Sequence, residues 1–278
     1  MKKISRRSFL AAAGLSVAAL ALTACGGSAS SVASSVASSA SSAAASTSAA
    51  AGELTTVEAG KLTMATNAAF PPYEMTTDAG EFEGIDIDTA KAIAEKLGLE
   101  LQIDDMDFDA ALLSVQQGKA DIVMAGVTVT DERKAVMDFS DSYATGIQSI
   151  IVPEGSDIAS PDDLAGKKIG TQRGTTGYIY CSDDFGDENV VAYDDGLTAV
   201  QALNNGQVDA VVIDNAPAQE FIAANPGLKI LDTSYAEEDY AIGMAKNSPL
   251  EDAVNSVLEE LKADGTLQAI VDKYITAE

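Results

Sequence analysis

A short pattern that occurs twice restricts the possible fold more than any other feature of this chain. The two copies are SVQQGKADIVMA at residues 114–125 and ALNNGQVDAVVI at residues 202–213. In each copy a predicted helix end is followed by a glycine, and an aspartate three residues later precedes an apolar run. The glycine suits the left-handed conformation that ends many helices, and the apolar run suits a buried strand. The pattern favours two similar α/β units, although a common helix-to-strand turn that recurs by chance would look the same.

Short apolar runs alternate with amphipathic segments from about residue 56 onward, and this alternation indicates strands joined by helices. Strands are predicted at residues 61–67, 100–103 and 120–125. Helices are predicted from an N-cap at Asp88 to Gly98, over residues 108–117, and at the C-terminus over residues 249–262 and 267–274. Strand–helix–strand alternation predicts an α/β fold with parallel strand pairing.

The first 24 residues have the composition of an export signal. The basic stretch MKKISRR, residues 1–7, precedes a largely apolar run at residues 8–24. This combination is typical of a secretory signal peptide and is too short for a stable membrane span. The arginines within SRRSFL resemble a twin-arginine export signal, but a general secretory signal fits them equally well.

The stretch LTAC, residues 22–25, resembles a bacterial lipobox, in which Cys25 is lipidated and begins the mature chain. Residues 25–56 are rich in serine and alanine and are predicted to form a tether. The protein is therefore expected outside the cytoplasm, anchored through Cys25 to the outer face of the cell membrane, or in the periplasm. The other cysteine, Cys181, then has no partner for a disulfide and is expected to be a small buried residue.

The net charge and the lack of histidine exclude several classes of function. The formal net charge is −26, whereas binding to nucleic acid or to an anionic membrane needs clustered basic residues, so neither is an expected partner. The sequence contains no histidine, which excludes Ser-His-Asp and Cys-His catalysis and argues against a zinc site. No metal ion and no cofactor are expected.

Arginine is rare in this chain, and one arginine stands in an informative place. In AGVTVTDER, Arg133 follows an apolar run that ends at Gly126. An arginine binds a carboxylate through two parallel hydrogen bonds, which a lysine cannot do, and Thr128 adds a hydroxyl and an amide. The alternative is a surface arginine paired with Asp131 or Glu132, a pair that adds little stability.

Two further stretches have the chemistry of a binding site. In TQRGTTG, residues 171–177, free amides and hydroxyls at a helix start suit an anion, although simple capping by Thr175 or Thr176 explains them as well. In VVID, Asp214 closes an apolar strand at the edge where α/β proteins bind ligands. Its carboxylate suits an ammonium group, and capping of a helix that begins near Ala216 is the equal alternative.

Six stretches, taken in order, resemble the polar amino-acid solute-binding proteins of bacterial ABC importers, family 3, and among them the glutamine-binding type. The stretches are MATNAAFPPYEM, GIDIDTAKAIA, MDFDAALLSVQQGKADIVMAGVTVTDERKAVMDFSDSY, GKKIGTQRGTTG, DAVVID and ADGTLQAIVDKY. The resemblance implies a two-lobed, periplasmic-binding-protein-like fold of type II, with two α/β domains joined by two hinge strands. One lobe would comprise residues 57–144 plus 241–278 and the other residues 145–240, and hinge bending would close them on the ligand.

The resemblance also implies a role for individual residues. Arg133 would bind the α-carboxylate of an amino acid with the amides of Thr128 and Thr176, and Asp214 would bind the α-ammonium with the carbonyl of Gly126. The ligand-binding residues expected from the resemblance are Asn67, Phe70, Phe108, Ala125, Gly126, Thr128, Arg133, Gln172, Thr175, Thr176 and Asp214.

The class of ligand follows from the residues that would surround its side chain. Phe70 and Phe108 would form the walls, and Asn67 and Gln172 would face the side chain. Members of the family that bind basic amino acids usually carry an acid in place of Asn67, so a polar, uncharged amino acid is expected. Glutamine binders commonly have a lysine in place of Gln172, so the identity of the amino acid stays open.

A protein of this kind is not an enzyme, and its expected partners are the amino acid and the transmembrane subunits of an ABC permease. A monomer is expected. The alternative is a secreted prephenate or arogenate dehydratase-like enzyme on the same fold. Such an enzyme would need further cationic residues, and Arg173 is the one extra arginine after the signal segment.

Overall fold

The computed structural model describes residues 54–275. The predicted signal segment, the lipidation site at Cys25 and nearly all of the predicted tether lie outside the described residues. Within residues 54–275, no helix is long and apolar enough to cross a membrane.

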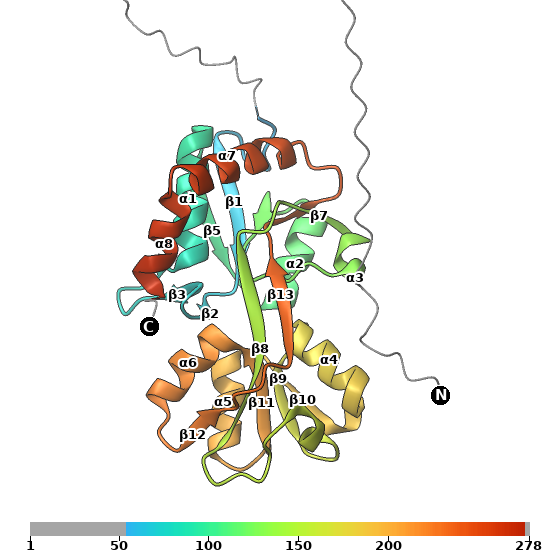
Figure 1. The fold of residues 1–278 in the computed structure, drawn as a ribbon. Coiled ribbons are helices and arrows are strands. Elements are labelled where there is room, and N and C mark those ends of the chain that lie inside the picture. The colour runs from blue at the N-terminus through green and yellow to red at the C-terminus, as the bar shows by residue number, and fades with distance from the viewer. Residues whose placement is uncertain (1–53, 276–278) are drawn as a thin grey trace, which may run out of the picture. The chain divides into compact units, whose positions relative to one another are not determined.

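Two separate mixed sheets form the framework, and each is the centre of one lobe (Figure 1). The first lobe contains a five-stranded sheet in the order β5-β1-β6-β14-β7. Its strands are β5 (Glu100–Asp105), β1 (Lys61–Thr66), β6 (Ile122–Val123), β14 (Gly243–Ala245) and β7 (Met137–Phe139). Strand β1 pairs in parallel with both β5 and β6, as the strand–helix–strand alternation predicts.

The second lobe contains a sheet in the order β10-β9-β11-β8-β12, with β13 paired to β8. Its strands are β10 (Val190–Tyr193), β9 (Ile169–Gln172), β11 (Ala210–Asp214), β8 (Ala144–Pro153), β12 (Leu228–Ile230) and β13 (Ala236–Tyr240). Strands β9, β10 and β11 are parallel, and β8 is antiparallel to β11, β12 and β13. The predicted α/β class is confirmed.

Helices cover both sheets, and a small third sheet lies beside the first lobe. The helices are α1 (Ile85–Leu97), α2 (Phe108–Gln116), α3 (Asp131–Lys134), α4 (Thr176–Phe185), α5 (Gly196–Asn204), α6 (Asn215–Ala224), α7 (Glu251–Ala263) and α8 (Thr266–Tyr274). The third sheet comprises β2 (Ala69–Phe70), β3 (Glu74–Thr76) and β4 (Phe82–Glu83). Two short 3-10 helices lie at Pro161–Leu164 and Asp187–Asn189. Helices α1, α7 and α8 contact one another, so the C-terminal segment completes the first lobe.

The repeated sequence pattern forms the same structure in both lobes. Gly118 and Gly206 both adopt the left-handed conformation, with φ of 65° and 67°. The aspartate after each glycine accepts from a backbone amide in, or directly before, a neighbouring strand. Asp121 accepts from the amide of Thr63 at 2.8 Å, and Asp209 accepts from the amide of Lys168 at the same distance. These matched contacts favour two related α/β units over a chance recurrence.

Strands β8 and β13 run side by side and lead from one lobe to the other (Figure 1). Strand β8 begins at Ala144, directly after the first-lobe segment, and β13 ends at Tyr240, directly before the chain returns to the first sheet. All five residues of β13 pair with the first half of β8. These two strands are the direct covalent connection between the lobes.

The prediction of Asp88 as a helix N-cap is wrong. Helix α1 begins three residues earlier, at Ile85, and its N-cap is Gly84 with φ of 133°. A Cβ at Gly84 would lie 2.1 Å from the carbonyl oxygen of Tyr73, so this early start needs a glycine. Asp88 lies in the first turn, and its carboxylate contacts Lys273 and Tyr274 of α8. Cys181 is fully buried, as predicted.

Candidate functional site

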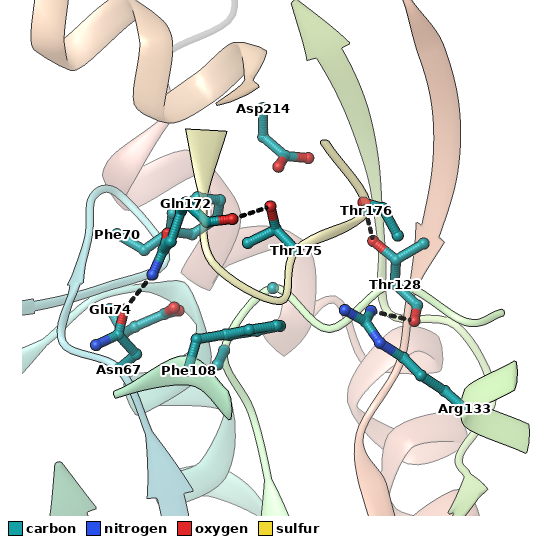
Figure 2. Close-up of a pocket in the computed structure, with 12 residues that line it drawn as sticks. Asn67, Phe70, Glu74, Phe108, Thr128, Arg133, Gln172, Thr175, Thr176 and Asp214 are labelled. Carbon is teal, nitrogen blue, oxygen red and sulfur yellow. Dashed lines mark hydrogen bonds between the residues drawn. The ribbon is translucent and has the colours of Figure 1, made fainter. Parts of the chain in front are cut away.

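One pocket brings together all eleven ligand-binding residues expected from the sequence, together with Glu74 (Figure 2). It is lined by Asn67, Phe70, Glu74, Phe108, Ala125, Gly126, Thr128, Arg133, Gln172, Thr175, Thr176 and Asp214. The first eight belong to the first lobe, and the last four follow or end strands β9 and β11 of the second lobe. Strand ends from two sheets therefore meet at this pocket.

Arg133 is buried in the pocket wall, with 8% of its surface exposed. Its Nη1 donates to the carbonyl of Thr128 at 2.7 Å, and its Nη2 donates to the carbonyl of Gly174 at 3.1 Å. The guanidinium also lies over the ring of Phe108, 5.3 Å from its centroid. The alternative of a surface arginine paired with Asp131 or Glu132 is therefore wrong.

A buried cation is costly unless polar groups surround it. Burial lowers the pKa of the Arg133 guanidinium, and the negative charge of Glu238 opposes this shift. An arginine side chain nevertheless keeps its proton near neutral pH. Arg133 is thus a fixed positive charge facing the pocket.

Asp214 brings a negative charge from the second lobe. It stands at the N-cap position of α6, but its side chain makes no capping hydrogen bond. Its two oxygens instead accept from the hydroxyl of Tyr240 and from Nε2 of Gln148, the latter at 2.7 Å. The capping alternative is therefore wrong for the side chain, which is held by two other buried groups. Burial raises the pKa of Asp214 to about 6, and the hydrogen bond from Tyr240 opposes the shift.

The two adjacent threonines at the start of α4 differ in their contacts. Thr175 caps the helix, because its hydroxyl accepts from the amide of Tyr178 at 3.3 Å. The capping alternative is confirmed for this residue. Thr176 instead donates its hydroxyl to Glu238 at 2.9 Å and approaches the hydroxyl of Thr128 at 3.5 Å.

A polar contact between Gln172 and Asn67 joins the lobes, in addition to the contact between Arg133 and Gly174. Gln172 donates from Nε2 to Oδ1 of Asn67 at 2.8 Å (Figure 2). The amide of Asn67 in turn donates to the carbonyl of Met106 at 2.9 Å. Together with the bond from Arg133 to Gly174, this contact holds the lobes together across the pocket.

The apolar wall of the pocket includes a close contact between the ring of Phe70 and the backbone of Gly126. Phe70 packs against Gly126, where φ is +55° and a Cβ would lie 2.8 Å from the ring. Only glycine combines this backbone conformation with such a contact. Phe108 lies opposite, beneath Arg133.

Glu74 is the pocket residue that the sequence did not identify. It is fully buried, and its carboxyl group forms a hydrogen bond with Asp86, which requires a proton on one of the two acids. Burial raises the pKa of Glu74 well above its usual range, and the neighbouring Asp86 raises it further. Asp86 itself accepts from the amide of Gly126 and from the hydroxyl of Tyr143. The only sequence signal was an acid within the otherwise apolar stretch FPPYEM.

Arg173 does not reach this pocket. Its side chain is 55% exposed and lies 3.6 Å from Asp194, in a separate hollow that Asp107 and Asp109 also line. Residues 54–275 contain no group of three side chains suited to hold a metal ion.

Comparison with known proteins identifies the family of this chain. The model of the bacterial extracellular solute-binding proteins, family 3, matches residues 62–277. The chain belongs to this family. A probable histidine-binding protein of Neisseria gonorrhoeae is 32% identical over 275 residues, which cover 96% of this chain and 95% of that protein. The ABC transporter arginine-binding protein 1 of Escherichia coli is 31% identical over 222 residues, 78% of this chain and 91% of its own length.

A solved structure, an ancestral arginine-binding protein bound to glutamine, is 42% identical and superposes with a TM-score of 0.75. The match covers 78% of this chain and 99% of that one. The predicted two-lobed fold of type II is confirmed by this likeness. This family 3 member is an extracytoplasmic solute-binding protein and not an enzyme, as the sequence predicts.

Proposed function

We propose that this protein captures an L-amino acid between its lobes and delivers it to the transmembrane subunits of an ABC importer. The lobes would be residues 57–144 plus 241–278 and residues 145–240, joined at β8 and β13. The observation that carries the proposal is the pocket, in which a buried arginine from one lobe and a buried aspartate from the other both face the space between. The named relatives bind amino acids, which agrees with this proposal.

The two charges match the two ends of an amino acid. Arg133 would bind the α-carboxylate with the amides of Thr128 and Thr176, and Asp214 would bind the α-ammonium with the carbonyl of Gly126. A zwitterion has no net charge, so the negative charge of the whole chain does not repel it as it would a dianion. Each of its charges still needs a local partner once water leaves the pocket. Closure would then be favoured only by a ligand that carries both ends.

The side chain of the ligand would lie between Phe70 and Phe108 and point toward the amides of Asn67 and Gln172. These groups suit a side chain that is polar and donates N–H hydrogen bonds. An uncharged amide, as in glutamine, fits Asn67 and Gln172 without a further charge in the pocket.

A second candidate ligand is arginine, and Glu74 is the observation that favours it. Once ionised, its buried carboxylate would accept N–H groups of a guanidinium. Burial and Asp86 hold the pKa of Glu74 well above its usual range, and a guanidinium beside Glu74 would lower this pKa and pair with the ionised carboxylate. The ancestral relative is called an arginine-binding protein and was solved with glutamine bound, so its pocket is an example in which both ligands are named for one protein.

Titration calorimetry with the twenty amino acids tests the function. We expect glutamine or arginine to bind most tightly, with a dissociation constant well below about 1 mM. We expect Glu74→Gln to weaken arginine binding at least tenfold and glutamine binding by less than about threefold, because the buried carboxylate would serve only the cation. No binding of any amino acid below about 1 mM would end the proposal. Tightest binding of an aliphatic or acidic amino acid would remove this account of the side-chain pocket.

Binding is expected to weaken at acidic pH. The ligand's ammonium needs the ionised form of Asp214, whose pKa is raised to about 6 by burial. Lowering the pH from about 7 to about 5 should therefore reduce the affinity for glutamine roughly tenfold. Glutamine keeps the charges of its own α-groups across this range. Calorimetry at several pH values therefore reports the titration of the protein and not that of the ligand. Equal affinity at both ends of the range would contradict the role of Asp214.

The stability of the ligand-free protein is expected to respond to pH in the opposite direction. The raised pKa of Asp214 means that the folded state holds a proton that the unfolded state releases. The stabilisation that this bound proton gives to the folded state is fully present below the ordinary pKa of 3.8, and it is lost as the pH rises through about 6.

The membrane attachment belongs to the same proposal. A lipid on Cys25 and the Ser/Ala-rich tether of residues 25–56 would keep a monomeric receptor near its permease. Mass spectrometry of the membrane fraction, before and after Cys25→Ser, tests the anchor directly.

A further inference from the structure

The carboxylate of Glu238 connects both lobes and both connecting strands at one point. Its Oε2 accepts from the hydroxyl of Thr128 at 3.0 Å and from the hydroxyl of Thr176 at 2.9 Å. The same oxygen accepts from Nε2 of Gln148 at 3.1 Å. Glu238 is on β13, Gln148 is on β8, and the two threonines belong to different lobes.

All members of this contact are buried. Thr128, Thr176, Gln148 and Glu238 are each at most 7% exposed, so water does not compete for these hydrogen bonds. Bonds to an ionised acceptor in such surroundings are stronger than bonds between neutral groups. If the lobes move apart, the bond from Thr128 to Glu238 breaks, whereas Thr176 and Gln148 lie in the same lobe as Glu238 and can keep their bonds to it.

Glu238 does not line the pocket, although the two threonines that it holds do. Thr128 is held on one side and Thr176 on the other, and both would present amides to the α-carboxylate. Gln148 contacts Asp214 at 2.7 Å with the same nitrogen that contacts Glu238, so the contact extends to the proposed ammonium site. The negative charge of Glu238 also acts on Arg133.

We propose that Glu238 is a positioning residue that holds the lobes in the closed arrangement by binding one threonine from each lobe. Closed here means the arrangement in which Thr128 and Thr176 share the carboxylate. Glu238 makes no contact with the ligand. It stabilises the state in which the ligand is enclosed and therefore slows the ligand's release. The part that concerns release rests on the proposed function, whereas the part that concerns the lobes does not.

The first experiment measures the distance between the lobes without any ligand. Spin labels at Gln116 on α2 and Asp183 on α4, both exposed, report the separation in a Cys25→Ser background with Cys181 buried. We expect Glu238→Ala to shift the distance distribution toward longer values. The matched control is Glu237→Ala, which removes the same charge from the exposed neighbour on the same strand and should leave the distribution unchanged.

The second experiment measures release, with glutamine and arginine as probes. We expect Glu238→Ala to raise the dissociation rate of the bound amino acid by roughly tenfold to a hundredfold and to change the association rate much less. Glu238→Gln keeps an acceptor oxygen in place and should recover most of the loss. If Glu238 only stabilised the fold, Glu238→Ala and Glu238→Gln would lower the melting temperature equally. The dissociation rate would then not rise more than the association rate changes.

The outcomes separate the two proposals. Unchanged interlobe distances together with unchanged dissociation rates in Glu238→Ala would overturn the role of Glu238. A shift in distance in a protein that binds no amino acid would support this role and refute the proposed function. If Glu238→Ala does not fold, Glu238→Asp keeps the charge but is one methylene shorter, and it should shift both readouts in the same direction.

Discussion

Replacing Arg133 with alanine is expected to weaken amino-acid binding by at least about a hundredfold. The guanidinium is buried and would give two charged hydrogen bonds to the α-carboxylate, each worth more than a neutral one. Without it, the carboxylate would enter a pocket that contains Glu74 and Asp214 and no remaining basic side chain among the residues that line it. Titration calorimetry measures the loss, and thermal unfolding shows whether the fold survives.

The chain offers a matched control for this experiment. Arg173 belongs to the second lobe near the pocket, but its side chain is largely exposed and pairs with Asp194. An exposed pair of this kind adds little energy, so Arg173→Ala should leave the affinity within about twofold. Equal losses in the two variants would mean that Arg133 acts only through the overall charge. Unchanged affinity in Arg133→Ala would remove it from the site.

Asp214→Asn is the second change with a large expected effect, a loss of roughly a hundredfold in affinity. Asparagine keeps the shape and can still accept from Gln148, but it removes the charge that would bind the ammonium. Its amide group would also face that ammonium as a donor. The measurement is calorimetry with the preferred amino acid, and Asp194→Asn, an exposed acid of the same lobe, is the control.

A ligand variant makes this experiment specific. An analogue of the preferred amino acid that lacks the α-amino group should bind weakly to the unmodified protein. It should lose little further affinity in Asp214→Asn, because the interaction in question is already absent. A full additional loss would show that Asp214 acts on the fold and not on the ammonium.

Much of the fold followed from the sequence because its signals are local. The glycine and aspartate of the repeated pattern fix a helix end and a strand start within a few residues, and both copies form as expected. The start of α1 was misplaced for a tertiary reason. Gly84 begins the helix early because it packs against the backbone of Tyr73, and this contact cannot be read from the helix itself.

The expected site residues lie at strand ends and in recognisable stretches, and the structure brings all eleven into one pocket. Taken by itself, Arg133 could equally have been a surface arginine paired with an acid, and its burial against Thr128 and Gly174 excludes that alternative. Glu74 and Glu238 were not predicted. Each is an acid that becomes important through burial beside distant partners, and a sequence of this acidity contains many acids that remain in solvent.

The hydrogen bond between Gln172 and Asn67 also affects which ligands the pocket refuses. The two amides satisfy each other across the lobes at 2.8 Å. A side chain that enters between them breaks this bond and must replace it with donors and acceptors of its own. Leucine or methionine would leave Oδ1 of Asn67 without its donor in a buried place, and Nε2 of Gln172 with only its longer bond to the carbonyl of Asp194. This loss disfavours an apolar side chain. Rejection of apolar amino acids would thus arise from a bond that the protein already makes with itself.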